Sequence, residues 1–79
     1  MTPEDLIAFT RRQPFEPFRV VLTDGATYEI RHPDMMLPTL RTVTIGIPAE
    51  PGQEVAERSI TAAMIHVVSV EPMERAAKA

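Results

Sequence analysis

Four basic side chains in the first half of the sequence have the chemistry to bind an anion. Arg11 and Arg12 follow a short segment with helical spacing, and Arg31 and His32 follow a segment of alternating residues. Guanidinium groups bind carboxylates and phosphates through paired hydrogen bonds, so a convergence of these side chains would form an anion site or contact RNA phosphates. The alternative is that all four lie in water at element ends, the usual place of arginine on a protein surface.

The other polar residues offer little for metal binding or acid–base chemistry. His32 and His66 are the two histidines, and neither belongs to an H-x-x-E or H-x-x-x-H pattern. We interpret His66, between two apolar residues, as a half-buried structural residue, and Asp24 and Asp34 as turn residues. Cysteine is absent from the sequence, as are a nucleophile motif, a phosphate loop and a dinucleotide fingerprint. We therefore expect no catalytic residue, no metal, no cofactor and no enzymatic activity.

The methionines permit two interpretations. Flexible thioether side chains can line an adaptable binding surface, but they also fill gaps in irregular cores. The second interpretation is the simpler one for methionines beside an irregular strand. The residues concerned are Met35, Met36, Met64 and Met73.

Size and charge limit the class of protein. A chain of 79 residues without cysteine forms one domain whose core is only just large enough, so self-association would add stability. The net charge of −3 does not favour a nucleic-acid binder that depends on phosphate contacts. No apolar run reaches the roughly 18–20 residues of a membrane span, and the acidic N-terminus does not resemble a signal peptide. A cytoplasmic protein without membrane contact is the expectation.

The elements that must position these residues begin with a helix over residues 2–12. Thr2 is a good N-cap, Pro3 suits the first helical position, and Glu4 complements the positive end of the helix dipole. Pro14 ends the helix because the residue before a proline avoids helical angles. Such a short helix needs a surface to pack on.

The clearest structural signal is a β-hairpin over residues 18–32. Facing the apolar rows of its two strands requires a three-residue loop, Thr23-Asp24-Gly25, rather than a two-residue one. Gly25 then takes the loop position that needs a positive φ. This register pairs Leu22 with Ala26, Val20 with Tyr28, Phe18 with Ile30 and Arg19 with Glu29.

The rest of the chain predicts shorter elements. A short irregular strand precedes a turn at 39–41, and a regular strand follows over residues 42–47. Residues 48–58 read as a flexible polar loop, and residues 73–79 as a tail. Between Ser59 and Pro72, alternation at Ile60, Ala62 and Met64 is followed by a second short apolar strand with Val68 and Val70. A single straight strand of that length would be unusual, so we expect a kink near Ile65 and His66.

Two resemblances follow from these segments. The pattern Arg11 to Arg19, then Leu22 to Gly25, Ile30 to Pro33 and Val67 to Pro72, resembles a group of small bacterial proteins. That resemblance covers nearly the whole chain and implies no activity. The second concerns architecture. A short helix before about five strands, with a kinked final strand and a Val-x-Leu-x-Asp-Gly turn, is similar to Sm-like and SH3-like small barrels, which implies ring formation and RNA binding.

We therefore predict a mainly β (α+β) single domain over residues 1–79. A short N-terminal helix covers a small, bent antiparallel barrel of about five strands over residues 18–72. The expected function is binding or assembly through a protein partner or a homo-oligomer, and the alternative is an Sm-like RNA-binding protein. The predicted core consists of Leu6, Phe9, Phe18, Val20, Leu22, Tyr28, Ile30, Val43, Ile45, Met64, Val68 and Val70.

Overall fold

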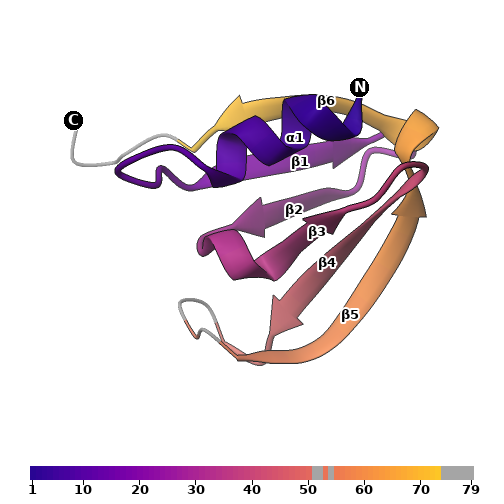
Figure 1. The fold of residues 1–79 in the computed structure, drawn as a ribbon. Helices are drawn as coiled ribbons and strands as arrows, with labels where there is room; N and C mark the ends of the chain where they lie inside the picture. Colours follow the sequence, from indigo (N-terminus) through magenta and orange to yellow (C-terminus); the bar gives the residue numbers. More distant parts are fainter. Residues whose placement is uncertain (51–52, 54, 74–79) are drawn as a thin grey trace.

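The structure, a computed structural model, describes residues 1–50, 53 and 55–73. This part of the chain forms one α-helix, six strands and two 3-10 helices, η1 and η2 (Figure 1). The elements are α1 (Pro3–Thr10), β1 (Phe18–Leu22), β2 (Thr27–Ile30), η1 (Pro33–Met35), β3 (Met36–Pro38), β4 (Thr42–Pro48), β5 (Ala56–Ala63), η2 (Met64–His66) and β6 (Val67–Pro72).

The strands form two antiparallel sheets, each of three strands. The strand orders are β2-β1-β6 and β3-β4-β5, and the chain crosses between the sheets at η1 and at η2 (Figure 1). The prediction of a mainly β domain with one short N-terminal helix is confirmed. The prediction of a barrel of about five strands is corrected, because six strands lie in two separate sheets among the described residues. The two 3-10 turns interrupt the strands that would otherwise carry the ladder from one sheet to the other.

Helix α1 begins as its capping residues predict. The Asp5 N–H donates to the Thr2 hydroxyl and the Thr2 N–H donates to the Asp5 carboxylate, both over 3.2 Å, which makes a capping box. Arg11 is the C-cap, so the helix is slightly shorter than residues 2–12. Phe9 of the helix packs on Phe18 of β1 with ring centroids 5.3 Å apart, and α1 also contacts β3.

The hairpin has the predicted three-residue loop. The Leu22 N–H donates to the Ala26 carbonyl and the Gly25 N–H donates to the Leu22 carbonyl, both over 2.9 Å. Gly25 has a φ of 88°, and Asp24 accepts the Ala26 N–H. The predicted pairs of β1 with β2 are present, including Arg19 opposite Glu29 with a 3.8 Å ion pair.

The segment predicted as a loop over 48–58 is only partly a loop. β4 extends to Pro48 and β5 begins at Ala56, so residues at both ends of that range belong to strands. Pairing resumes at Ala56 with Pro48 after a register shift. The rest of this range includes residues 51, 52 and 54, which lie outside the described residues, as does the predicted tail beyond Met73.

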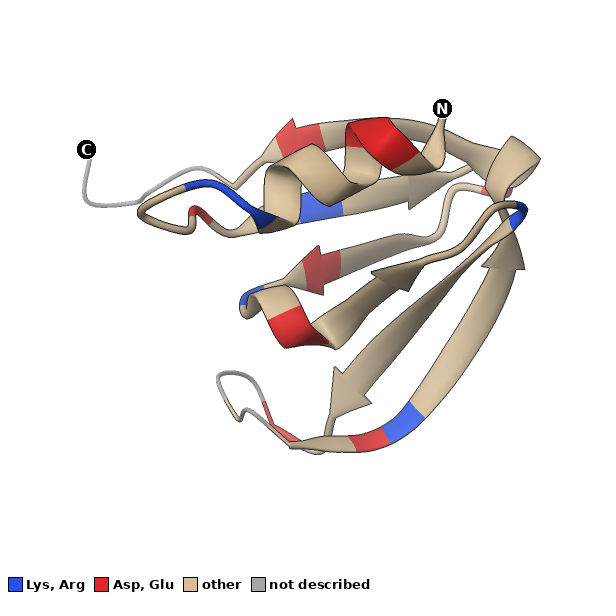
Figure 2. Ribbon diagram, viewed as in Figure 1, with Lys and Arg blue, Asp and Glu red and all other residues tan. Residues whose placement is uncertain are grey.

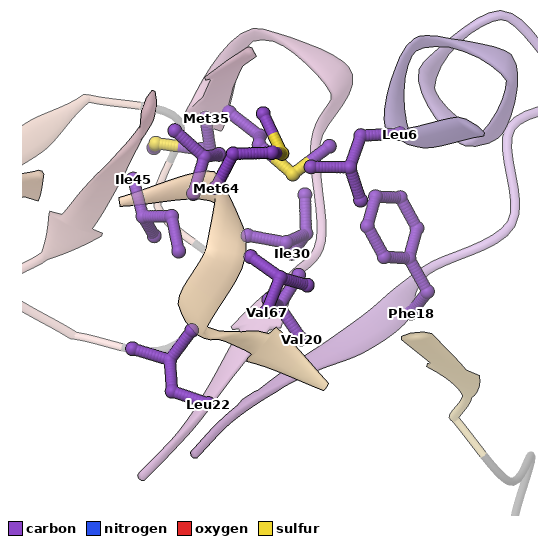
Figure 3. Close-up of a cluster of buried hydrophobic side chains, with 11 residues drawn as sticks. Leu6, Phe18, Val20, Leu22, Ile30, Met35, Ile45, Met64 and Val67 are labelled. Atoms are coloured by element: carbon purple, nitrogen blue, oxygen red, sulfur yellow. The ribbon is translucent and has the colours of Figure 1, made fainter. Parts of the chain in front are cut away.

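One hydrophobic core joins the helix, both sheets and both 3-10 turns. Figure 3 shows side chains from all of these elements pointing toward one another. Phe9, Tyr28 and Val70 belong to the predicted core but are only partly buried against it. The buried residues are Leu6, Phe18, Val20, Leu22, Ile30, Met35, Met36, Val43, Ile45, Met64 and Val67.

The prediction that Val68 is buried is wrong, because the helical turn η2 changes the phase of the following strand. Val67 is 5% exposed and lies opposite Leu22, whereas Val68 is 56% exposed. A register shift between Val21 and Leu22 accommodates this change, and Val70 again lies opposite Val20. A simple two-residue period counted back from Val70 therefore misplaces the start of β6.

The capping box predicts a pH dependence of stability. The backbone N–H and then the hydroxyl of Thr2 lower the pKa of Asp5 below its usual value of 3.8. Because the folded state favours the ionised form, this contribution is present at neutral pH and is lost as pH falls through the lowered pKa. Asp5→Asn should therefore lose stability at pH 7 and approach the parent protein once pH falls below the lowered pKa of Asp5.

Urea unfolding across this pH range measures the effect, with Glu4→Gln as the control that removes the same charge without touching the Thr2 bonds. A difference between Asp5→Asn and the parent protein that stays constant from pH 7 to pH 2 would contradict the capping account.

The hairpin predicts a cost for any side chain at Gly25. Its φ of 88° is left-handed, where an L-residue loses about 1–2 kcal/mol, although no atom crowds the position. Alanine also reduces the entropy of the unfolded chain, which offsets part of this strain. Gly25→Ala should therefore lower the free energy of unfolding by about 1 kcal/mol. Gly25→Asn should cost less, since asparagine tolerates this region better. Equal stability of the three proteins in urea would refute this assignment.

Candidate functional site

A pocket of about 370 Å³ lies where β2 and the C-terminal half of β4 face each other without pairing. We call it the seam pocket. In Figure 1 the two strands diverge on the side where η1 connects β2 with β3. The lining comprises Thr27, Tyr28, Glu29, Arg31, His32, Met35, Ile45, Gly46, Ile47, Pro48 and Gln53.

The outer edge of β2 directs unpaired backbone groups toward this seam. Leu22 and Ala26 are a hydrogen-bonded pair, and hydrogen-bonded pairs alternate with non-hydrogen-bonded ones along an antiparallel ladder. Tyr28 therefore directs its N–H and C=O toward β1, whereas Thr27 and Glu29 direct theirs away from β1. β2 is an edge strand, so no described strand pairs with that side.

The same alternation shows which residues of β4 direct their backbone N–H and C=O groups toward the pocket side. The Thr42 carbonyl accepts the Thr39 N–H over 2.8 Å, and the Arg41 carbonyl accepts the Met64 N–H over 2.7 Å. Thr42 and Gly46 consequently direct their backbone groups toward β3 rather than β5. β3 pairs with β4 only from Val43 to Ile45, so Gly46 lies beyond the end of β3.

The floor of the pocket is apolar and continuous with the core. Ile45 is 1% exposed and Met35 is 6% exposed, while Tyr28 and Ile47 are partly buried. Gly46 has no side chain where it meets Met35: a Cβ there would lie 3.0 Å from the Met35 sulfur and 3.0 Å from the Ala56 Cβ. Met35 can therefore lie close to β4 at the end of β3.

The polar rim contains two of the four predicted contact residues, Arg31 and His32, and each already interacts with a neighbouring acidic residue. Arg31 donates from Nε and Nη2 to the Glu29 carboxylate over 3.2 and 2.9 Å. The His32 Nδ1 accepts the Asp34 N–H and lies 3.8 Å from the Asp34 carboxylate. The rim therefore carries compensated charge, and Figure 2 shows acidic and basic residues side by side there.

Arg11 and Arg12 do not line the seam pocket. The Arg12 guanidinium lies 4.7 Å from the centroid of the Phe9 ring and 3.4 Å from the Glu16 carboxylate. Arg11 caps α1 through its backbone N–H and is exposed. The structure thus brings Arg31 and His32 to one pocket but leaves the two helix arginines outside its lining.

Among the described residues, no group of three or more histidine, cysteine, aspartate or glutamate side chains is placed so that it could hold a metal ion. His66 is exposed rather than half-buried as predicted, and its Nδ1 lies 3.2 Å from the Thr23 hydroxyl. Within the same part of the chain, no helix has the length and apolar character to cross a membrane.

β5 is the longest edge strand among the described residues, and much of it is exposed. Ile45 directs its backbone groups toward β5 and is paired there with Ile60, so the N–H and C=O groups of Ile60 point toward β4. Ser59, Thr61 and Ala63 then direct their N–H and C=O groups outward. Their side chains lie on the same face as Thr44, whose hydroxyl is 3.0 Å from that of Thr61.

Comparison with known proteins adds no relative: no family model, no curated protein and no solved structure matches this chain. The assignment of sites therefore depends on geometry alone. Sequence reasoning missed the seam pocket, although Pro38 and Gly46 were signals for it. A proline shortens β3, and a glycine inside a strand often marks a close approach of another backbone.

The contact at Gly46 predicts that a single methyl group disturbs the pocket floor. Gly46→Ala should lower the free energy of unfolding by about 1–3 kcal/mol, because Met35 or Ala56 must move. The double variant Gly46→Ala/Ala56→Gly removes one of the two contacts and should recover part of that loss.

Urea unfolding measures both effects, and the NMR signal of the Met35 methyl group reports on the pocket. An unchanged Met35 signal together with full stability in Gly46→Ala would show that this contact does not shape the floor.

Proposed function

We propose that this protein is a non-enzymatic binding and assembly module that self-associates through the outer edge of β5. The observation that carries the proposal is an eight-residue edge strand whose last five residues, Ser59 to Ala63, carry no charge and no proline. Natural edge strands usually carry lysines, prolines or bulges that prevent pairing with other chains. On β5 the only charges are Glu57 and Arg58, near its N-terminal end.

The outward groups of this edge favour an antiparallel pairing with a second copy. Ser59, Thr61 and Ala63 present their backbone N–H and C=O groups to solvent, because the residues that alternate with them pair with β4. A two-fold axis at Thr61 would place Ser59 opposite Ala63 and Ile60 opposite Ala62. The paired stretch would then be uncharged, and Glu57 would lie outside it.

The size of the chain supports a second copy of the same chain as the partner that pairs with this edge. A domain of 79 residues buries a small core and has no disulfide to stabilise it. Pairing two β5 edges would extend each three-stranded sheet into one continuous six-stranded sheet. The resulting interface would be isologous, the type found in two-fold dimers, which are the commonest oligomers of soluble proteins.

The order of the elements also supports a proposed relation to the Sm-like and SH3-like folds. A short N-terminal helix precedes short antiparallel strands, and β5 and β6 are joined by the 3-10 turn η2. RNA binding is the alternative function that this relation implies. The geometry lends it less support, because Arg12, Arg19 and Arg31 each lie beside a carboxylate.

The test uses Ser59, whose N–H faces outward and takes no part in the ladder with β4. Ser59→Pro removes that N–H on both copies and adds a ring at the edge, while Ser59→Ala keeps it. The loss of two hydrogen bonds per dimer should weaken association by about tenfold or more. Size-exclusion chromatography with light scattering over a concentration series measures the dimerisation constant.

The parent protein and Ser59→Ala should reach twice the monomer mass, and Ser59→Pro should remain monomeric at the same concentrations. Circular dichroism controls for folding of each variant. A parent protein that stays monomeric at millimolar concentration, or a Ser59→Pro variant that dimerises equally well, would refute assembly through β5.

A further inference from the structure

We infer that the seam pocket binds an extended, uncharged segment of a partner polypeptide, which pairs with the outer edge of β2. This site uses a different edge from the proposed self-association, so each can fail without the other. The inference rests on backbone groups that face the pocket, on its apolar floor and on the compensated charge of its rim.

The backbone of the pocket walls is complementary to an extended chain. Thr27 and Glu29 direct their N–H and C=O groups away from β1, and on the other wall Gly46 lies beyond the end of β3. Groups of this kind at alternate residues match the spacing of a β-strand, in which every second residue faces the same neighbour. A strand added at β2 would satisfy groups that no described strand pairs with.

The side chains of the pocket specify what such a strand would insert. Tyr28, Met35 and Ile47 belong to the apolar floor, which continues into the core at Ile45. Alternate side chains of the added strand would point to this floor, and the others would point to solvent. The volume of about 370 Å³ is within the range of pockets that hold small ligands, so it accommodates only a short stretch of side chains.

The rim argues for an uncharged occupant. Arg31 is held by two hydrogen bonds to Glu29, and His32 lies beside Asp34. An anionic ligand would have to compete with Glu29 for Arg31, and a cationic one would have to compete with Arg31 for Glu29. Peptide groups and apolar side chains bind without breaking either interaction.

Selection from a phage-displayed library of random heptapeptides on the immobilised full chain tests the inference. Ile47→Asp, which places a carboxylate on the pocket floor, serves for counter-selection. Leu40→Asp is the matched control, because Leu40 is exposed and lies in the turn between β3 and β4, away from the pocket lining. Enriched peptides should carry apolar residues at alternate positions and no proline at their centre.

Synthetic, end-blocked versions of the enriched peptides are then titrated by fluorescence anisotropy. Thr27→Pro removes one outward N–H and leaves the ladder with β1 intact, since Thr27 faces away from β1. It should weaken binding by about three- to tenfold, the effect of one hydrogen bond. Ile47→Asp should abolish binding, and Leu40→Asp should leave the dissociation constant unchanged. NMR shifts should appear at Thr27, Glu29 and Gly46.

Three results would overturn the inference. The library could yield no peptide that prefers the parent protein to Ile47→Asp. The enriched peptides could shift the signals of Ser59 and Thr61 on β5 instead of those around the seam pocket, which would favour the other edge. A blocked single amino acid, N-acetylvaline methylamide, could bind as tightly as the peptides, which would identify a small apolar ligand rather than a strand.

Discussion

The apolar row of β1 is the constraint on which the rest of the structure depends. Phe18, Val20 and Leu22 are buried. Phe18 and Val20 are each paired with both β2 and β6, and Leu22 lies between Val67 of β6 and Ala26 at the end of the hairpin loop. Because successive side chains of a strand face opposite ways, this row fixes the register of both neighbours at once. A slip of one residue on either side would place that neighbour's apolar side chains in water. The helix then packs on the same row through Phe9 and Leu6, so the core is organised around one strand.

The second sheet is attached to this one through turns rather than through a continuous ladder. η1 and η2 each contribute a buried methionine, Met35 and Met64, that packs between the sheets. Flexible side chains of this kind fill the irregular space left where strands of two sheets diverge. The same divergence leaves the seam pocket between β2 and β4, which belong to different sheets and do not pair. The pocket is therefore a consequence of how the two sheets are joined, and its floor is part of the core.

The parts of the fold set by local rules could be predicted from the sequence. Thr2, Pro3 and Pro14 define the helix, and the requirement that apolar rows face each other selects the loop ending at Gly25. The places where a 3-10 turn interrupts the alternation of a strand could not be predicted in the same way. Pro33 and the segment around Ile65 indicate breaks, but not that each break is a helical turn with a buried methionine. The burial of Val67 instead of Val68, and the division into two sheets, follow from those turns.

The candidate sites were also only partly predictable from the sequence. Residue type identified Arg31 and His32, which lie at the seam pocket, and equally Arg11 and Arg12, which do not line it. Residue type gives no information about which backbone groups lack partners, and both proposed sites consist of such groups. The unpaired edges of β2 and β5 become visible only when the direction of each N–H is assigned from the ladder. A protein whose polar side chains mostly satisfy one another can still present binding surfaces through its backbone.

Amide hydrogen exchange at single-residue resolution tests most directly whether the seam between the two sheets is open. At low protein concentration, the N–H groups of Tyr28 and Ile30, which face β1, should exchange slowly. Those of Thr27 and Glu29, which face the seam, should exchange faster by orders of magnitude, as expected of amides outside any ladder. Equal protection of all four amides would contradict the account, because it would mean that another strand already occupies the outer edge of β2.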